Sequence, residues 1–281
     1  MTVTAGPTFT DSDDEALHAV AGPVQRVSFI GRVAIVTGAA HAAGRGYAIA
    51  LASAGGHVVV ADGNEAQGQE TVAGIEKSGG SACFCAVDVT DEDSTRLAAS
   101  FAVETFGRLD VLVNNAATYG ATSRRGLAEL TVEQWDNTMA VFVKGVWLMS
   151  KAAVPFLSAA PHPAIINHTS VAAYGVDRWL DYGTARGAVI ALTKSMAHEL
   201  AAQRIRVNAI AVGSMGVEAV ALGVVADEAQ MRQTAEFKRQ LIPRLGTEDD
   251  VGGAALFLAT EASSYMTGQT LVIDGGKFFL G

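Results

Sequence analysis

The stretch VAIVTGAAHAAGRGYAIALASAGGHVVVAD, residues 33–62, decides the fold of this 281-residue chain. It joins a β-branched run, a glycine-containing turn, a helical segment at 46–55 and a second apolar run that ends at Asp62. Gly38 permits a tight turn, and Gly44 lets the start of the helix approach both the sheet and a bound pyrophosphate, which the free helix amides would hold. The stretch therefore predicts a strand–helix–strand unit that binds a dinucleotide.

The acidic residue at the end of the second apolar run bears on the choice of dinucleotide. Asp62 follows Gly38 by 24 residues. An acidic side chain at this place accepts hydrogen bonds from the adenosine ribose and repels a 2′-phosphate. The sequence therefore favours NAD, although a simple turn residue would look the same. His41 and Arg45 lie in and beside the glycine turn and keep NADP possible.

Apolar runs of strand length alternate with longer amphipathic segments along the chain from residue 29. Parallel strands need helical crossovers, so this pattern predicts an α/β fold with a three-layer, doubly wound parallel sheet of about seven strands, the Rossmann fold. We expect a single domain over residues 28–281, a flexible N-terminal arm over 1–27 and a lid over 214–243. The expected strands are 33–38, 57–62, 82–89, 109–116, 164–170, 206–213 and 270–276, and helical segments include 46–55, 94–107 and 250–263.

The composition narrows the classes of partner and compartment. The chain is 49% hydrophobic and 17% charged, with a formal net charge of −9. A nucleic-acid binder needs a basic stripe, and the pair Arg124 and Arg125 is too small to be one, so we expect no nucleic acid. No basic and apolar leader precedes the first strand, and no run reaches the ~18–20 apolar residues of a membrane span. We therefore expect a cytoplasmic protein that does not enter a membrane.

Cys83 and Cys85 are the only cysteines of the chain. They lie two residues apart in an expected strand, so their side chains share one face. We interpret them as core residues, with metal or redox chemistry as the alternative, and we expect no metal site. The absence of further disulfide partners suits a reducing compartment.

Several motifs then occur in the order and at the spacing of one family. TGAAHAAG (37–44) is followed by Asp88-Val89, by NNAA (114–117), by IINHTSVAA (165–173), by DYGTARGAV (181–189), by RIRVNAIAVG (204–213) and by LVIDGG (271–276). From about residue 29 to 276 the chain resembles the short-chain dehydrogenase/reductase family. The resemblance implies a nicotinamide cofactor held by Gly38, His41, Gly44, Asp62, Asp88, Val89, Asn115, Ala116, Tyr182, Arg186 and Gly213.

The same resemblance implies the catalytic residues. Tyr182 would be the acid/base of hydride transfer, and Ser170, twelve residues earlier, would hydrogen-bond the substrate oxygen, with Thr169 as the second choice. A phenol ordinarily ionises near pH ~10 and needs a nearby cation to work near neutrality. Arg186 occupies the position of the lysine of the family. Its charge can act on the phenol, but an arginine is a rigid planar fork that does not pass protons along a relay.

Further departures from the family pattern leave two hypotheses about function. Phe142 stands where the family has an asparagine that holds a water, Ala42 replaces the middle glycine of the turn, Val212 a proline, and Val217 a threonine. The first hypothesis is an NAD(P)-dependent oxidoreductase that interconverts a secondary alcohol and its ketone. The second is a catalytically silent or repurposed member, such as the structural partner of an active paralogue.

The substrate and the assembly are expected from weaker signals. A bulky hydrophobic small molecule, such as a steroid, terpenoid, polyketide or acyl thioester, would suit as substrate an apolar pocket lined by Tyr119, Phe142, Tyr174, Trp179, Leu180 and Met215. The resemblance implies a homodimer or homotetramer that pairs through helices at about 133–157 and 182–201. The second helix carries the small residues Gly183, Gly187, Ala188 and Ala191. A hetero-oligomer with a paralogue stays an alternative.

Overall fold

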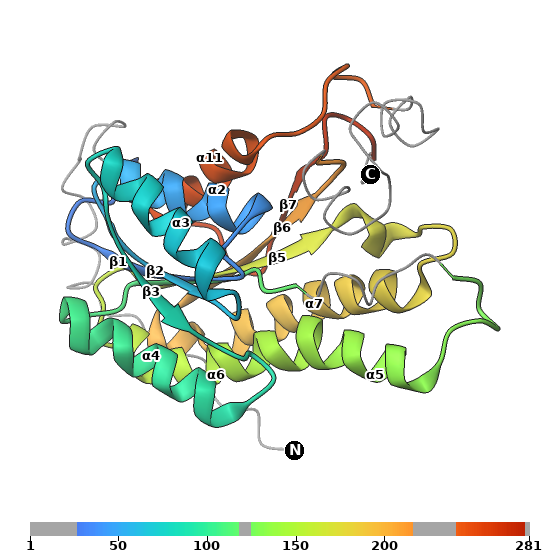
Figure 1. The fold of residues 1–281 in the computed structure, drawn as a ribbon, viewed down its shortest axis with the longest axis horizontal. Helices are drawn as coiled ribbons and strands as arrows, with labels where there is room; N and C mark the ends of the chain where they lie inside the picture. The colour runs from blue at the N-terminus through green and yellow to red at the C-terminus, as the bar shows by residue number, and fades with distance from the viewer. Residues whose placement is uncertain (1–26, 118–124, 216–239, 279–281) are drawn as a thin grey trace.

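Seven parallel strands form one sheet in the order β3-β2-β1-β4-β5-β6-β7 (Figure 1). The structure, a computed structural model, describes residues 27–117, 125–215 and 240–278. The predicted doubly wound parallel sheet is confirmed. The strand order reverses between β1 and β4, and ligands of such sheets bind at that reversal, outside the carboxyl ends of the strands. The strands are β1 (Val33–Thr37), β2 (His57–Asp62), β3 (Ser81–Ala86), β4 (Val111–Asn114), β5 (Ala164–Ser170), β6 (Arg206–Val212) and β7 (Thr270–Ile273).

Helices cover both faces of the sheet, and an apolar cluster fills each of the two interfaces (Figure 1). One face carries α2 (Ala42–Ser53), α3 (Glu65–Lys77) and α11 (Glu248–Ala259). The other carries α4 (Glu92–Phe106), α5 (Val132–Met139), α6 (Gly145–Leu157) and α7 (Leu180–Glu199). Short elements complete the described chain: a π-helical turn η2 (Ala140–Lys144) and the 3₁₀ turns η3 (Val171–Tyr174), η4 (Ala201–Gln203) and η5 (Glu261–Ser263).

Side-chain caps start several helices earlier in the chain than hydrophobic periodicity alone predicts. Helix α4 begins at Glu92, two residues before the predicted start, because the Asp91 carboxylate accepts a hydrogen bond from the amide of Ser94 (2.7 Å). The helix ends at Gly107, whose φ of 81° is the left-handed conformation that glycine adopts freely. The first turn of such a helix is polar, so hydrophobic periodicity does not reveal it, and the capping residue marks its start instead.

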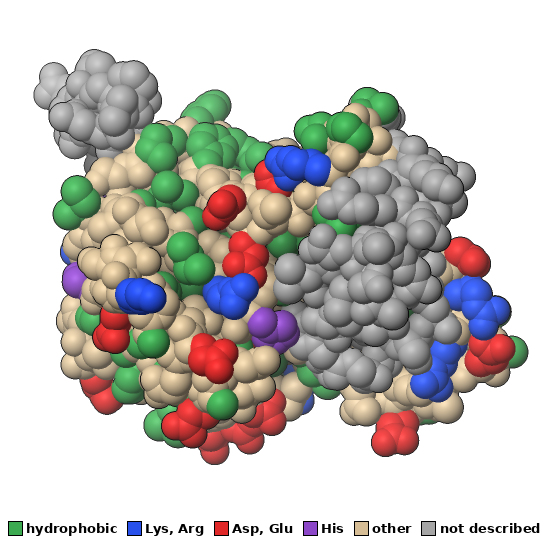
Figure 2. Space-filling view, turned by 45° about the horizontal axis from the view of Figure 1, so that its top comes forward, with side chains coloured by type: hydrophobic (Ala, Val, Ile, Leu, Met, Phe, Trp, Pro, Cys, Tyr) green, Lys and Arg blue, Asp and Glu red, His purple; other side chains and the backbone are tan. Residues whose placement is uncertain are grey.

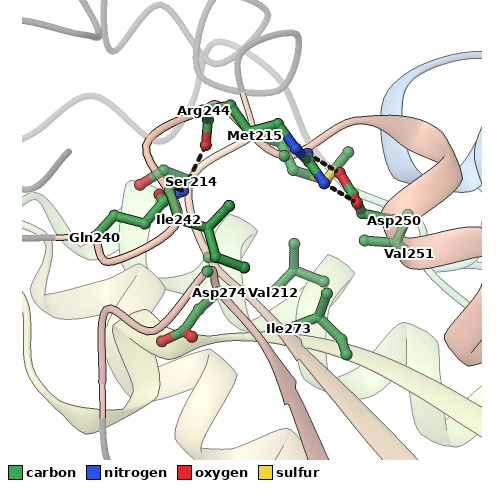
Figure 3. A pocket seen from close by; sticks show the side chains of 13 residues that line it. Val212, Ser214, Met215, Gln240, Ile242, Arg244, Asp250, Val251, Ile273 and Asp274 are labelled. Carbon is green, nitrogen blue, oxygen red and sulfur yellow. Dashed lines mark hydrogen bonds and ion pairs between the residues drawn. The ribbon is translucent and has the colours of Figure 1, made fainter.

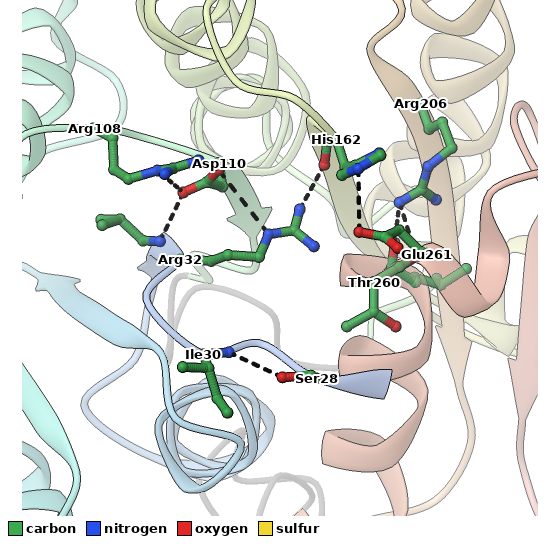
Figure 4. Close-up of polar contacts among 11 residues, drawn as sticks. Ser28, Ile30, Arg32, Arg108, Asp110, His162, Arg206, Thr260 and Glu261 are labelled. Carbon is green, nitrogen blue, oxygen red and sulfur yellow. Dashed lines mark hydrogen bonds and ion pairs between the residues drawn. The ribbon is translucent and has the colours of Figure 1, made fainter. Parts of the chain in front are cut away.

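A buried carboxylate fixes the amino-terminal edge of the sheet (Figure 4). Asp110 is fully buried and accepts hydrogen bonds from the amide of Val33 (2.9 Å) and from Nε and Nη2 of Arg108 (2.8 and 2.6 Å). Nε of Arg32 lies 4.0 Å away, and Nη2 of Arg32 donates to the backbone oxygen of His162. These contacts join β1, the start of β4 and the segment before β5 at the edge opposite the ligand end.

The cysteines pack as core residues. Cys83 and Cys85 are half-buried on β3 and contact the apolar cluster beneath α4. Burial raises the pKa of the Cys83 thiol to about 11 and also raises the pKa of Cys85. Both thiols are therefore protonated at neutral pH, which supports the core interpretation. Among the described residues, no group of three or more His, Cys, Asp or Glu is placed to hold a metal ion.

Two further features bear on partners. Among the described residues, one helical stretch, Val132–Leu157, is apolar and long enough to cross a membrane by length and composition alone. Core helices meet the same criterion, and this stretch packs against α4 and α7. Figure 2 shows Lys and Arg side chains scattered among acidic ones on the face it presents.

The N-terminal arm up to residue 26, Tyr119, Val217 and most of the expected lid lie outside the described residues.

Candidate active site

The glycine turn after β1 is packed so closely that its two key positions accept only glycine. Gly38 has a φ of 65°, and a Cβ there would lie 2.7 Å from Cα of Ala116. A Cβ on Gly44 would overlap the carbonyl oxygen of Gly38. The side-chain amide of Asn115 donates to the oxygens of Thr37 (3.1 Å) and Gly38 (3.0 Å), and β4 ends at Asn114, two residues before the predicted end of the strand. This turn is the phosphate-binding shape that the sequence predicts.

Ala42 carries backbone strain in this turn. Its φ is 48°, in the left-handed region, where a side chain with a Cβ is unfavourable by about 1–2 kcal/mol. Ala42→Gly should therefore raise the free energy of unfolding by about 0.5–1 kcal/mol, after subtraction of the larger entropy of glycine in the unfolded chain. Chemical denaturation measures the change.

The neighbouring residue supplies the control for this prediction. Ala43 lies in the first turn of α2, outside the left-handed region. Ala43→Gly should therefore lower stability by about 1 kcal/mol, the ordinary helix penalty of glycine. Equal destabilisation by the two substitutions would show that residue 42 is not strained.

A groove of about 690 Å³ runs from this turn along the carboxyl ends of β1, β2 and β4. It is lined by six of the predicted cofactor residues: Gly38, His41, Asp62, Asp88, Val89 and Ala116. Gly44 and Asn115 lie behind the lining and shape the turn. Six lining residues were not predicted, because they come together only where the ends of four strands, the start of α3 and η2 meet: Gly63, Asn64, Gln67, Val87, Ala117 and Val141.

Charges at the ribose end of the groove are arranged around Asp62. Its carboxylate accepts hydrogen bonds from the amides of Ala40 (3.0 Å) and Asn64 (2.9 Å), which hold it at the end of β2. Arg45 does not face it as an open cation, because its Nε and Nη2 both bind the Glu248 carboxylate at 2.8–3.1 Å. Burial lowers the pKa of His41, so its imidazole is mostly neutral at pH 7. The groove therefore presents a carboxylate without a competing cation from either residue.

Tyr182 and Arg186 lie one turn apart on α7 and are both buried, at 3% and 2% exposure. The guanidinium carbon of Arg186 lies 4.9 Å from the centre of the Tyr182 ring. The ring of Trp179 stacks on the ring of Tyr182, with the two centroids 4.4 Å apart. Nη1 of Arg186 donates to the backbone oxygen of His168 on β5 (3.0 Å). A fixed positive charge therefore lies beside the phenol ring, as the sequence analysis expected.

The structure distinguishes between the two hydroxyls at the end of β5. Thr169 is fully buried, and its hydroxyl donates to the backbone oxygen of Arg186 (2.8 Å). Ser170 is partly exposed; its hydroxyl donates to the oxygen of Val212 (3.3 Å) and accepts from the amide of Ala172 (3.2 Å). Thr169 therefore serves to tie α7 to β5, and Ser170 is the hydroxyl that a substrate can reach.

The expected pocket residues do not form one wall. Phe142 and Trp179 pack with Tyr182 in one cluster, whereas Leu180 is exposed and Tyr174 lies beside Phe278. Met215 and Gly213 instead line a separate cavity of about 100 Å³ at the ends of β6 and β7 (Figure 3). At the edge of this cavity Arg244 pairs with Asp250 and holds the pKa of that carboxyl well below its usual range.

Two buried polar pairs beside Tyr182 were not predicted. The hydroxyl of Thr138 donates to Asp181 (2.8 Å), and Nδ1 of His168 lies 2.9 Å from the hydroxyl of Tyr47. Burial, and then the charge of Arg186, hold the pKa of His168 well below its usual value. Each pair joins residues from distant elements, so the local sequence gave no signal for it.

The fold and the groove define a Rossmann-type enzyme that binds a dinucleotide, and comparison with known proteins agrees. Residues 38–277 match the family model described as enoyl-(acyl carrier protein) reductase. The chain belongs to the short-chain dehydrogenase/reductase family and is an oxidoreductase. It is 40% identical over 251 residues to the cis-4-hydroxycyclohexanecarboxylate dehydrogenase of Sinomonas cyclohexanicum, a match that covers 89% of this chain and 97% of the relative.

Two similar solved structures hold nicotinamide cofactors. A 7α-hydroxysteroid dehydrogenase in complex with NADH and 7-oxo glycochenodeoxycholic acid is 31% identical, with a TM-score of 0.83 and coverage of 90% of this chain and 96% of that one. A gluconate 5-dehydrogenase from Burkholderia cenocepacia, in complex with NADP and tartrate, is also 31% identical with a TM-score of 0.83, and the match covers 91% and 98% of the two chains. These neighbours support a nicotinamide cofactor and leave the choice between NAD and NADP open.

Proposed function

We propose that this protein is an NAD-dependent dehydrogenase/reductase that interconverts a secondary alcohol and its ketone. The observation that carries the proposal is the buried Arg186 guanidinium beside the ring of Tyr182, on the helix that follows β5 and Ser170. Nε of Arg186 is buried and has no hydrogen-bond partner within the described residues, so a donor is available to a cofactor hydroxyl. This orphaned donor and the close-packed glycine turn both fit a dinucleotide.

The residues of the chain divide the chemistry among them. A nicotinamide dinucleotide held in the groove lined by Gly38, Asp62 and Ala116 would supply the hydride chemistry at the carbinol carbon. Ser170 donates a hydrogen bond to the substrate oxygen and so fixes it. The Tyr182 phenolate takes the hydroxyl proton of the alcohol, and the phenol returns a proton to the oxygen in reduction. The positive charge of Arg186 stabilises the phenolate.

Asp62 supports NAD over NADP in this proposal. Its carboxylate would bind the ribose hydroxyls and repel a 2′-phosphate, and neither Arg45 nor His41 offers a free positive charge to offset that repulsion. Asp62→Asn removes the charge and keeps the size. We expect it to raise the ratio of kcat/KM with NADP to kcat/KM with NAD about tenfold, the equivalent of ~1.4 kcal/mol. Initial-rate kinetics with both cofactors measure the ratio.

The second carboxylate of the groove provides the control. Asp88 lines the same groove after β3 rather than β2, and its Oδ1 already accepts hydrogen bonds from the amide (2.8 Å) and the hydroxyl (2.7 Å) of Thr90. Asp88→Asn should leave the cofactor ratio nearly unchanged. A wild-type enzyme that prefers NADP would contradict the assignment of Asp62.

For the substrate we propose a ring-bearing secondary alcohol or its ketone. The relatives named above include a dehydrogenase of a hydroxylated cyclohexane and one of a hydroxysteroid. Phe142 and Trp179 pack with Tyr182 in one apolar cluster, so the surroundings of the phenol are apolar. A panel of cyclic and steroid alcohols, followed by the absorbance of NADH, tests the proposal. NADH binding without turnover on any of them would favour the silent or repurposed alternative.

We also propose a homodimer or homotetramer that acts in the cytoplasm. The small residues of α7 are only partly available for pairing with another subunit, since a Cβ on Gly183 would lie 3.1 Å from the oxygen of Ala172 in the same chain. Gly183 therefore allows α7 to pack closely against η3 of the same chain. Gly187, Ala188 and Ala191, which are not fully buried, remain the candidates for close contact between helices.

A further inference from the structure

The guanidinium of Arg186 lies in a corner formed by two aromatic rings. Its central carbon is 4.3 Å from the centre of the Phe142 ring and 4.9 Å from that of Tyr182. The two rings are perpendicular, with centroids 5.5 Å apart. Phe142 is 1% exposed, so water does not separate the ring from the cation. The nearest ring to the charge is therefore that of Phe142.

The polar contacts of Arg186 do not by themselves explain where it lies. One hydrogen bond, from Nη1 to the oxygen of His168, is made to a neutral acceptor, and Nε has no partner within the described residues. In the described ranges no carboxylate lies within ion-pair distance of it. A buried cation with so few polar partners is unfavourable unless another attraction offsets the loss of water. The faces of aromatic rings attract cations, and more strongly when water is excluded.

Phe142 reaches this place through an irregular helix. It is the central residue of the π-helical turn η2, which joins α5 to α6. The sequence AVFVK of this turn contains neither glycine nor proline, so tertiary contacts impose the wide turn. One such contact is near: Thr138, one turn before Phe142, bonds to Asp181, which precedes Tyr182. Widened turns of this kind re-aim side chains and are frequent at functional sites.

We propose that Phe142 is the positioning residue of the active-site cation: its ring holds the Arg186 guanidinium against Tyr182, and the effect of Arg186 on the phenol depends on Phe142. This inference rests on the proposed role of Tyr182 as acid/base. It joins the two largest departures from the family pattern, Phe142 and Arg186, into one unit, because an asparagine side chain has no ring face on which a guanidinium can lie.

A double-mutant cycle tests the dependence. Phe142→Leu removes the ring and keeps apolar bulk, Phe142→Tyr keeps the ring, and Arg186→Gln removes the charge. The readout is the pH at which Tyr182 ionises, obtained from the ultraviolet absorbance of phenolate after subtraction, for each variant, of the spectrum of the same variant that also carries Tyr182→Phe. It requires no turnover. Among the described residues, the titratable groups on the elements that meet here include Asp181, His168 with its partner Tyr47, and Lys144 at the end of η2, and they are unchanged in every variant.

We expect Phe142→Leu to raise the ionisation pH of Tyr182 by about one unit, a tenfold weaker acid. Phe142→Tyr should stay close to wild type. In the Arg186→Gln background, which raises the ionisation pH by itself, Phe142→Leu should add no further shift. If Phe142→Leu does not fold, as judged by circular dichroism, Phe142→Met tests the same expectation.

Several results would overturn the inference. Additive shifts in the cycle would show that Phe142 acts independently of Arg186, and an unchanged titration in Phe142→Leu would show that it merely fills space. A Tyr182 that ionises at the same pH with and without Arg186, or not before alkaline unfolding, would show that the cation does not act on the phenol. Failure of the proposed function is distinct, because wild-type protein that oxidises no alcohol can still give a coupled cycle.

Discussion

Tyr182→Phe should lower kcat by about 10³-fold or more while NADH binds with nearly unchanged affinity. General acid–base catalysis by a placed side chain contributes about 10²–10⁴-fold, and phenylalanine cannot take or give a proton. The contacts of Tyr182 with Trp179, Phe142 and Arg186 are made by its ring, which the substitution keeps. The packing of the site should therefore survive. Turnover of the best alcohol and fluorescence titration of NADH measure the two quantities.

Tyr265 offers a matched control, because its side chain is fully exposed. Tyr265→Phe removes the same hydroxyl from a tyrosine remote from the cluster and should leave kcat as it is. Turnover that persists in Tyr182→Phe would remove the phenol from the mechanism. A parallel loss of NADH affinity would instead mean that the substitution had damaged the groove.

Asp110→Ala should destabilise the fold by about 3–5 kcal/mol, the usual effect of removing one partner from a buried ion pair. The change leaves the amide of Val33 without its acceptor and removes from Arg32, whose side chain is 12% exposed, the carboxylate that lies 4.0 Å from its Nε (Figure 4). At about 2–4 °C for each kcal/mol in a domain of this size, Tm should fall by roughly 10 °C. Calorimetry or a thermal melt followed by circular dichroism measures it.

Arg108→Ala is the comparison for Asp110→Ala. It removes two hydrogen bonds to the same carboxylate, but the Arg108 side chain is 43% exposed, so its pairing is screened by water. Asp110 would keep the Val33 amide and the charge of Arg32. The loss should be clearly smaller than for Asp110→Ala. Equal losses would mean that the hydrogen bonds of Arg108, rather than burial of the carboxylate, stabilise this edge.

The local sequence was sufficient for the cofactor turn and for most strand cores. Strands 57–62 and 164–170 have the predicted bounds, because β-branched runs flanked by glycine or polar residues carry their signal locally. Gly38 and Asp62 line the groove and Gly44 packs against Gly38 in the turn, and their places follow from backbone conformation and short spacing. Boundaries were less accurate: β3 was predicted at 82–89 and forms at Ser81–Ala86.

The sequence by itself determined the layered fold, the family and the end of the sheet where the dinucleotide binds. Only the tertiary structure decided which charges act there. Arg45 is withdrawn from the cofactor by Glu248, 203 residues away in sequence, and Phe142 faces Arg186 through a π-helical turn that no local signal predicts. The reason is physical: strands and turns follow from local conformational preference, whereas the effect of a charge depends on its burial and on partners that distant elements supply.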